Sequence, residues 1–505
     1  MKKPFSNVAI SRCSEDLQKS VREVVDMLGG IGKFVKKGDT VFINPNLTAN
    51  MPSSTGGTTD VLFVEAVVSV VKDAEPSRII VGECSGNETR TMEGFIAYGY
   101  TDMCLRQGVE LADLDYAEIV ECRLENPLYR DIVRLPKIFL DSDVFISVPV
   151  MKTHIAAGIT VALKNSFGFI PDNDKMQSHR DNAIEEILVD IARVKPANLV
   201  IIDGRLGAEG IAGGTDFTHP IKAGLIYAAD DPVAADAASV RLMRQNPRVR
   251  YIQWASEKGV GNDNLDYINI HGLSIEEASK KFMSPMEQIE EEAGGKIRIH
   301  ELSPCTKCRS IGEGSVSRYS KNPNALLEPL DIVMGPGKWE MPAEMNPHTI
   351  LLGDCIREEY RNKGVWIGGC PGSGAKLGEA VSCGGIVCAK CARLAEKLVE
   401  EYTPEKLKDI RILASSRTVF TGKDNKAMMD DFLLAVGSCQ KGYCRYHKRR
   451  TYKLFGINTD EYMILVDECP PEESDVRLAL DELLGRAATL SEYDNVSTIT
   501  DNQER

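Results

Sequence analysis

The cysteines are the residues whose number and spacing point most directly to chemistry. The chain has 14 of them, and ten fall between Cys305 and Cys469. The N-terminus lacks the apolar run of a secretory signal, so we expect a cytoplasmic protein whose thiols stay reduced. Crowded thiols in a reducing compartment are typical of metal ligands rather than disulfides.

The first cysteine set offers the four thiolates that a 4Fe-4S cluster requires. Cys305 and Cys308 are two residues apart, which places both on one turn, and Cys355 and Cys370 each follow a predicted strand. Pro371 directly follows the last of them, as a proline does in bacterial ferredoxin motifs. Structural zinc is the alternative, but zinc ribbons usually contain two C-x2-C pairs and this set contains one.

The second set begins with the C-x4-C-x2-C spacing of the plant-type 2Fe-2S loop. Its candidate ligands are Cys383, Cys388, Cys391, Cys439, Cys444 and Cys469. Neighbouring glycines allow backbone N–H groups to face cluster sulfurs. The alternative, that these cysteines are small buried hydrophobes, fits one cysteine better than six in turns flanked by glycine and proline. We therefore expect a second iron–sulfur cluster, of the 2Fe-2S type if the spacing is diagnostic.

A second group of reactive side chains lies near the middle of the chain. Lys152, His154 and Lys164 bring two cations and an imidazole within thirteen positions. Such a set suits an anionic substrate, for example a carboxylate or a phosphate. The predicted catalytic residues are Lys152, His154, Lys164, Asn165 and Asp203, with His154 as proton donor. A solvated loop is the alternative for an isolated Lys-x-His pair, and placement at a strand end favours a site.

These residues follow short apolar runs that alternate with helical stretches. The predicted strands cover residues 40–46, 77–82, 144–150 and 198–204, and the predicted helices cover 59–72, 184–194 and 232–243. Strand, turn, helix and strand in succession predict an α/β domain with a mostly parallel sheet. Reactive groups gather at the carboxyl ends of such strands, which adds Asn44, Asn46 and Glu83 to the expected site. The glycine-rich run from Gly204 to Gly214 lacks the G-x-G-x-x-G spacing and predicts a loop without a nicotinamide cofactor.

The central motif resembles the signature of the family known as domain of unknown function 362. The matching positions are Pro149, Lys152, Thr153, His154, Lys164, Asn165, Phe167 and Gly168. Further similarity lies in Asn44-Pro45-Asn46, in Asp203 and in the run from Asp231 to Asp236, so the resemblance covers about residues 35–270. It implies a fold and a site at these positions, but no reaction.

The C-terminal cysteines resemble a second family. The run from Gly437 to Tyr446 is similar to the cysteine motif in the delta subunit of methyl-viologen-reducing hydrogenase, with Arg445 where that motif has histidine. The similarity covers about residues 385–485. It implies an electron-transferring iron–sulfur module.

Length and charge limit the remaining possibilities. With 505 residues the chain exceeds one ordinary core. The expected parts are an α/β domain at 1–275, a helical connector at 276–300, a cluster-binding α/β region at 301–380, a second cysteine-rich electron-transfer region at 381–490 and a flexible tail at 491–505. The net charge of −14 disfavours nucleic acid and anionic membranes as partners, and no segment is long enough to span a membrane.

Together these features predict an iron–sulfur oxidoreductase for an anionic small molecule, working in an oxygen-poor cytoplasm. A ferredoxin or a redox partner subunit would exchange electrons with the clusters. One alternative is a non-catalytic electron-transfer subunit of a larger redox complex, and another is a lyase or isomerase whose cluster acts as a Lewis acid. The sequence leaves open the substrate, a flavin and the oligomeric state, including a homo-oligomer.

Overall fold

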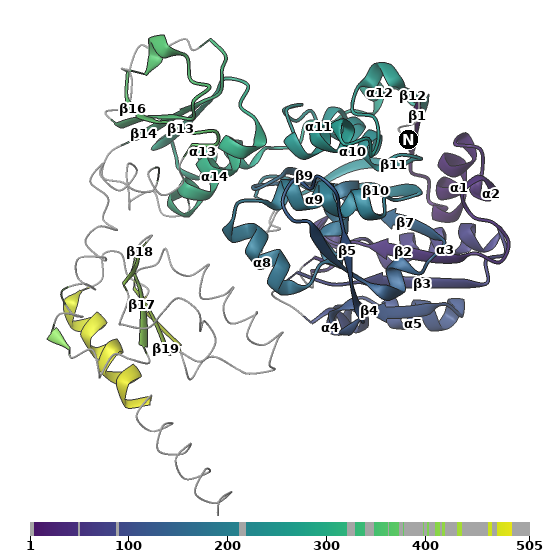
Figure 1. Cartoon of the computed structure of the whole chain (residues 1–505), viewed down its shortest axis with the longest axis horizontal. Helices are drawn as coiled ribbons and strands as arrows, with labels where there is room; N and C mark the ends of the chain where they lie inside the picture. Colours follow the sequence, from purple (N-terminus) through teal and green to yellow (C-terminus); the bar gives the residue numbers. More distant parts are fainter. Residues whose placement is uncertain are drawn as a thin grey trace, which may run out of the picture. The chain divides into compact units, whose positions relative to one another are not determined.

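The structure is a computed structural model, and its chain divides into two compact units (Figure 1). The first comprises Met1–Gln288, Glu301–Gly314 and Met334–Gly337, and the second comprises Ile289–His300, Ser315–Val333 and Lys338–Arg505. The described residues are 5–48, 51–86, 90–211, 219–320, 329–338, 348–361, 363–372, 377, 397, 401–402, 410–414, 417–419, 432–436, 463–466 and 472–486.

A large sheet organises the first unit. Among the described residues its ten strands follow the order β12-β1-β11-β10-β7-β2-β3-β4, with β8 beside β10 and β9 beside β8. These strands are β1 (Ser6–Arg12), β2 (Thr40–Pro45), β3 (Arg78–Glu83), β4 (Glu110–Asp113), β7 (Val144–Val148), β8 (Val150–His154), β9 (Gly158–Thr160), β10 (Leu199–Ala208), β11 (Pro220–Ala229) and β12 (Ile268–Gly272). The pairs from β10 through β7, β2 and β3 to β4 are parallel, whereas β11 is antiparallel to both neighbours. The predicted α/β class with a mostly parallel sheet is confirmed.

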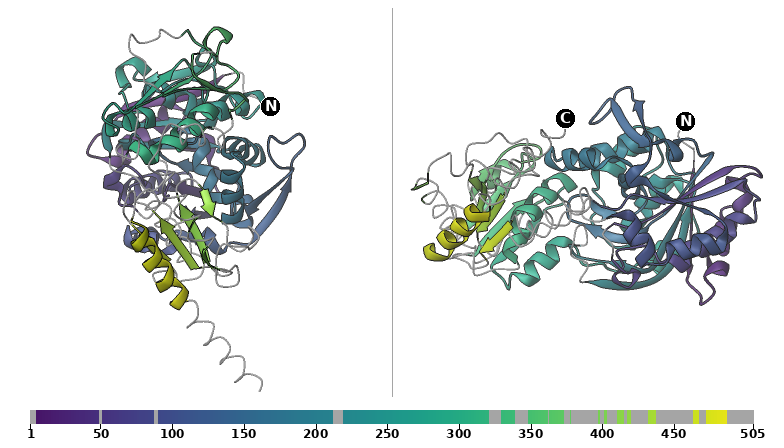
Figure 2. Two further views of the ribbon diagram at one scale, coloured as in Figure 1. Left: turned by 90° about the vertical axis from the view of Figure 1, so that its left-hand side faces the viewer. Right: turned by 90° about the horizontal axis from the view of Figure 1, so that it is seen from below.

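Helices cover both faces of this sheet, which Figure 2 shows from two further directions. Strand β2 illustrates the reason, because Val41 and Ile43 pack into one apolar cluster and Phe42 packs into the other. A strand buried on both faces needs an almost continuous apolar run, as this one has. Helices α1 (Leu17–Met27), α3 (Val61–Lys72) and α5 (Tyr100–Gln107) contribute to the first cluster, and α6 (Lys137–Leu140), α7 (Ala162–Asn165), α9 (Ile184–Val194), α10 (Pro232–Leu242) and α11 (Arg250–Glu257) to the second.

Shorter elements complete the first unit. They are α2 (Ile31–Phe34), α4 (Thr91–Ala97), α8 (Asp172–Arg180), α12 (Ile275–Ala278) and an antiparallel pair of β5 (Ile119–Arg123) with β6 (Ile132–Pro136). Helices α13 (Pro285–Glu292) and α14 (Thr306–Ser320) extend from the first unit into the second along the chain.

The structure differs from the sequence-based expectations in three places. The strand expected at 144–150 is two strands, because β7 ends at Val148 and β8 begins at Val150. The helical connector contains two short helices, α12 and α13, and a strand that begins at Ile297. The glycine-rich run expected to be a loop begins inside β10, which continues to Ala208 and pairs with β11.

The second unit contains two smaller sheets. The order β13-β14-β15-β16 joins Ile297–Glu301, Leu330–Met334, His348–Leu352 and Val365–Ile367. The order β18-β17-β19-β20 joins Arg417–Val419, Ile410–Ala414, Phe432–Val436 and Met463–Val466, and a helix covers residues 473–486. Across the described ranges, no helix combines the length and the apolar character needed to cross a membrane.

Candidate functional site

Polar side chains meet where the parallel strands β2, β3, β7 and β8 end. We call the group formed by Asn46, Lys152, His154, Thr160, Lys164 and Asn165 the carboxyl-edge site. Asn46 joins two of the predicted residues, because its Oδ1 accepts a hydrogen bond from Lys152 Nζ at 2.7 Å and its Nδ2 donates to Asn165 Oδ1 at 2.9 Å. The structure therefore brings together Lys152 on β8 and Asn165 at the end of α7.

Lys152 is held deep in the site. Its side chain is 2% exposed, and Nζ also donates to Thr48 Oγ1 at 3.1 Å and to the Gly57 carbonyl at 3.0 Å. Burial, together with the charge of Lys164, lowers the pKa of Lys152 to about 7. A lysine with such a pKa exchanges protons readily near neutral pH.

The ammonium group of Lys164 has no polar partner among the residues that the structure describes. It lies in the four-residue helix α7, where Asp236 accepts hydrogen bonds from the backbone N–H groups of Ala162 at 2.6 Å and Leu163 at 3.1 Å. Its Nζ lies 4.0 Å from the centre of the Phe167 ring and makes no hydrogen bond or ion pair with a described residue. Burial lowers the pKa of Lys164 to about 7. A cation that lacks a counter-ion in the described part of the chain suits an anionic ligand.

His154 differs from the proton donor that the sequence suggested. Its Nδ1 accepts hydrogen bonds from the backbone N–H groups of Ala156 at 3.0 Å and Ala157 at 3.1 Å. Burial and the charge of Lys164 hold the pKa of His154 well below its usual value of 6.5. The ring is therefore neutral near pH 7 and carries its proton on Nε2, from which it can donate a hydrogen bond.

Thr160 is a residue that sequence reasoning missed. It lies directly opposite Lys152 in the antiparallel pair of β8 and β9, so the two side chains project from the same face. The Thr160 side chain is 5% exposed, and its hydroxyl has no hydrogen-bond partner in the described part of the chain. His154 is 6% exposed, and its Nε2 makes no hydrogen bond there either. Counting described partners only, the site thus holds three donors without an acceptor, on Thr160, His154 and Lys164.

Asp203 is the predicted catalytic residue that does not join this group. Arg205, two residues later on the same strand, donates to both oxygens of Asp203 at 2.8 Å. Arg205 also lies 3.5 Å from Asp60. Within the described residues, the carboxylate of Asp203 makes no hydrogen bond to Lys152, His154 or Lys164. Its geometry is that of a bidentate ion pair.

A buried thiol and lysine lie beside the site. Lys175 Nζ on α8 is 2.9 Å from Cys84 Sγ and 3.3 Å from Asp172 Oδ1. Burial lowers the pKa of Lys175, but Cys84 and Asp172 outweigh that effect and raise it. Cys84 directly follows the strand-end residue Glu83, so the sequence could have placed Cys84 near the site. The position of Lys175 in the sequence gives no such indication.

Cys305 and Cys308 lie together at the start of α14 in the first unit. A hydrogen bond from the Cys308 thiol, and N–H groups of Cys308 and Lys307, lower the pKa of Cys305 to about 5. The turn is anchored on α9, because Lys307 Nζ donates to Glu186 Oε2 at 2.6 Å and the Thr306 hydroxyl donates to Glu185. A preformed thiolate beside a second thiol fits a ligand pair for an iron–sulfur cluster or for zinc.

The other predicted ligands are not tested by the structure. Cys355 and Cys370 are exposed and belong to the second unit. Six further candidates lie outside the described residues: Cys383, Cys388, Cys391, Cys439, Cys444 and Cys469. Among the residues that the structure describes, no three His, Cys, Asp or Glu side chains are placed to hold a metal ion.

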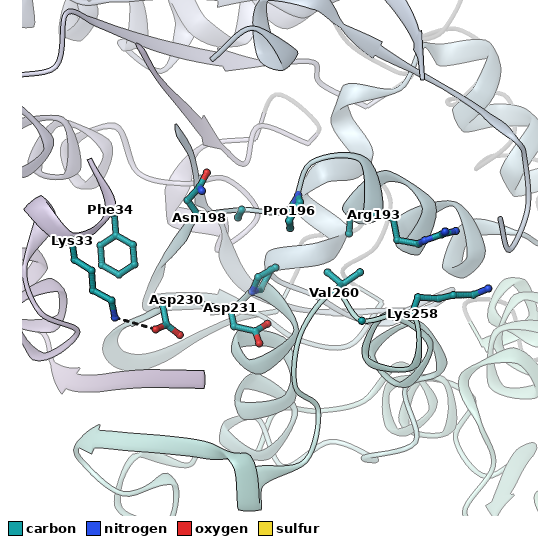
Figure 3. A pocket seen from close by; sticks show the side chains of 13 residues that line it. Lys33, Phe34, Arg193, Pro196, Asn198, Asp230, Asp231, Lys258 and Val260 are labelled. Carbon is teal, nitrogen blue, oxygen red and sulfur yellow. Dashed lines mark hydrogen bonds and ion pairs between the residues drawn. The ribbon is translucent and has the colours of Figure 1, made fainter. Parts of the chain in front are cut away.

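A pocket of about 540 Å³ lies at the opposite edge of the sheet, next to the first residues of β10 (Figure 3). Lys33 points to Asp230 in this view, and their charged atoms are 3.2 Å apart. Asp231 caps α10 by accepting hydrogen bonds from Val233 N at 2.8 Å and Ala234 N at 3.2 Å. The carboxylates of Asp230 and Asp231 in this pocket therefore stabilise the fold, through an ion pair and a helix cap.

Comparisons with known proteins agree with the central motif. The family model described as "Domain of unknown function (DUF362)" matches residues 41–241. The thylakoid-associated protein sll1697 of Synechocystis sp. (strain ATCC 27184 / PCC 6803 / Kazusa) is 30% identical over 242 residues, which cover 46% of this chain and 71% of that protein. The resemblance of the C-terminal third to a hydrogenase subunit lies beyond these matches and stays a prediction.

A solved structure, the lactate racemase apoprotein from Thermoanaerobacterium thermosaccharolyticum, aligns with 12% identity and a TM-score of 0.27. The alignment covers 40% of this chain and 50% of that chain, and a score this low does not establish a common fold. The family match and the relative in Synechocystis together are sufficient for assignment: the chain belongs to the DUF362 family.

Proposed function

We propose that the chain is an iron–sulfur oxidoreductase that binds an anionic small molecule at the carboxyl-edge site. The observation that carries this proposal is the position of the Cys305–Cys308 turn. A Cβ atom at Gly158 would lie 3.0 Å from Thr306 Cγ2, so this turn packs against the β8–β9 hairpin. Gly158 pairs with His154 in that hairpin. A cluster held by these cysteines would therefore be close to the residues that bind the substrate.

The three donors without a described acceptor give the site its expected ligand. Lys164 would neutralise a carboxylate, while Thr160 and the Nε2–H group of His154 would donate hydrogen bonds to its oxygens. Because His154 is neutral, it would polarise the substrate without titrating. Asp236 would hold α7 in place through its hydrogen bonds to the backbone of this helix, and would thereby position Lys164.

Electrons and protons would come from different groups. A cluster, once bound to Cys305, Cys308 and further cysteines, would supply or accept single electrons from a ferredoxin or a redox partner subunit. Lys152 would supply or accept the proton, since its lowered pKa lies near neutral pH. Zinc in place of the cluster would leave the anion site intact but remove the electron path.

A second candidate is an isomerase or lyase that moves a proton and needs no electron donor. It is favoured by the number of groups that titrate near neutral pH. Burial raises the pKa of Glu83 to about 8, while Lys152 and Lys164 are lowered to about 7. Such groups suit proton transfer next to a carboxylate. Turnover in the absence of any electron donor would favour this candidate.

Anaerobic purification followed by iron, sulfide and zinc analysis tests the proposal first. We expect about six to eight irons per chain, as two clusters would supply, with an EPR signal that changes on reduction by dithionite. Oxalate, as a probe anion, should alter this signal in the native chain but not in Lys164→Met. One or two zinc ions and no EPR signal would refute the redox function. Iron without an oxalate effect would refute the proximity of cluster and anion.

A further inference from the structure

Three asparagines connect a buried lysine to a buried glutamate. Lys152 Nζ donates to Asn46 Oδ1 at 2.7 Å, and Asn46 Nδ2 donates to Asn165 Oδ1 at 2.9 Å. Asn165 Nδ2 then donates to Asn44 Oδ1 at 2.8 Å, and Asn44 Nδ2 donates to Glu83 Oε2. We call these three amides the asparagine chain. Every hydrogen bond in it runs in the same direction, from the lysine to the glutamate.

The direction of the hydrogen bonds has an electrostatic consequence. Each amide turns its oxygen toward Lys152 and its N–H group toward Glu83, so the three dipoles are aligned. Aligned amides in a buried network polarise one another, and this arrangement stabilises an ammonium at one end and a carboxylate at the other. Burial acts in the opposite direction, because Lys152 is 2% exposed and Glu83 is 3% exposed. Burial and the asparagine chain therefore act in opposite directions on the charged pair.

We infer that Glu83 and Lys152 are electrostatically coupled through the asparagine chain, which stabilises the state in which both residues are charged. Glu83 is then a positioning residue, because it acts on the site through Lys152. This role deepens the proposed function, since it rests on Lys152 exchanging protons with a substrate. The coupling between the two residues does not itself require a substrate.

Other charges near the pair have to be counted. The titratable groups that act on Glu83 or Lys152 are Lys164, Lys175, His154 and Tyr100. Lys175 is nearest to Cys84 and Asp172, as described above. His154 is neutral, and burial keeps the Tyr100 hydroxyl protonated by raising its pKa. Lys164 and Lys175 stabilise the carboxylate of Glu83. The variants that test the asparagine chain therefore keep both of these lysines.

Infrared titration of the carboxyl groups measures this coupling in the full chain. The C=O band of protonated Glu83 is isolated by subtracting spectra of Glu83→Gln, which removes the contributions of other buried acids such as Asp236. In Lys152→Met this band should persist to a pH higher by about one unit, because the opposite charge is gone. Asn165→Leu breaks the asparagine chain without changing any charge, and it should shift the band in the same direction.

Ser147→Ala is the matched control. The Ser147 hydroxyl accepts a hydrogen bond from Asn165 Nδ2 at 3.1 Å but is not a link in the asparagine chain. We expect no shift of the Glu83 band in this variant. Asn46→Leu breaks the next link and replaces Asn165→Leu if that variant does not fold.

Each outcome decides the inference. An unchanged band in Lys152→Met, or in the variants with a broken asparagine chain, overturns it, and so does an equal shift in Ser147→Ala. Because no ligand and no cluster enters the measurement, a failure of the anion-binding or redox proposal leaves this result interpretable. Conversely, oxalate binding through Lys164 without any shift of the Glu83 band would support the proposed function and contradict the role of Glu83.

Discussion

The pH dependence of anion binding follows directly from the surroundings of Lys164. Only the ammonium form attracts an anion, and burial lowers the pKa of Lys164 to about 7. The ammonium fraction of the free protein then falls about 90-fold between about pH 6 and pH 9. Affinity for oxalate should fall by the same factor, provided that the bound ammonium keeps its proton. Titration of Lys152 would make the fall steeper.

Isothermal titration calorimetry with oxalate from about pH 6 to pH 9 measures this dependence. Lys164→Arg is the matched variant, because a guanidinium stays charged over the whole range and should give a nearly flat profile. Lys164→Met should lose binding at every pH. A flat profile for the native chain, or oxalate affinity in Lys164→Met equal to that of the native chain, would refute the reasoning.

Three further outcomes test other parts of the site. Asp236→Asn turns an N–H group toward backbone donors of α7, so the free energy of unfolding should fall by about 1–3 kcal/mol in urea titrations, with weaker oxalate binding; unchanged stability would contradict this role. His154→Gln keeps a neutral donor and should retain most oxalate affinity, whereas His154→Phe should lose about tenfold, the value of one hydrogen bond; equal losses would contradict the assignment. Cys305→Ser and Cys308→Ser should each remove iron during anaerobic purification, while the buried Cys104→Ser should keep it, and full iron content in all three would contradict ligation.

Much of the carboxyl-edge site could be predicted because strand ends and short motifs determine it. Lys152 follows from an apolar run that ends in polar residues, and parallel strands bring such ends to one edge. Asn165 follows from the motif that resembles the DUF362 signature. Asp203 also follows a strand, but Arg205 lies two residues later on the same face of that strand and pairs with it. The pattern that located Asp203 gave no information about this competing partner.

The missed residues depend on contacts between distant segments. Thr160 belongs to the site because β9 folds back on β8, and a three-residue strand has too short a pattern to be recognised. Asp236 lies within the helix predicted at 232–243, and the structure uses its carboxylate to hold a turn 74 positions earlier in the chain. Such pairings are properties of the tertiary structure, and no spacing along the chain encodes them.

The connector expected at 276–300 shows a related limit. The sequence predicts a helical connector there, but α12 ends at Ala278 and α13 begins with Pro285. Proline is favourable at the first turn of a helix and unfavourable in its interior, so a break before Pro285 was readable from the sequence.

Lys164 also links function to stability. A partly buried ammonium group with no hydrogen-bond acceptor among the described residues destabilises the fold, which is expected where the charge is held for a ligand. The folded-state pKa of about 7 lies below the value of 10.5 for an unperturbed lysine. The cost is therefore complete below about pH 7, where both states hold the proton. It falls between about pH 7 and pH 10, where the folded protein has lost the proton and the unfolded chain still keeps it.

Lys164→Met should thus raise the free energy of unfolding of the ligand-free chain by about 1–3 kcal/mol at about pH 6, and by little at about pH 10. Urea unfolding followed by circular dichroism at both pH values measures the difference. Lys175→Met is a useful contrast, because Lys175 has polar partners at Cys84 and Asp172 and its loss should destabilise the fold. If Lys164→Met instead lowered stability at the lower pH, Lys164 would have to be a structural residue, and the argument that its charge is held for an anion would fail.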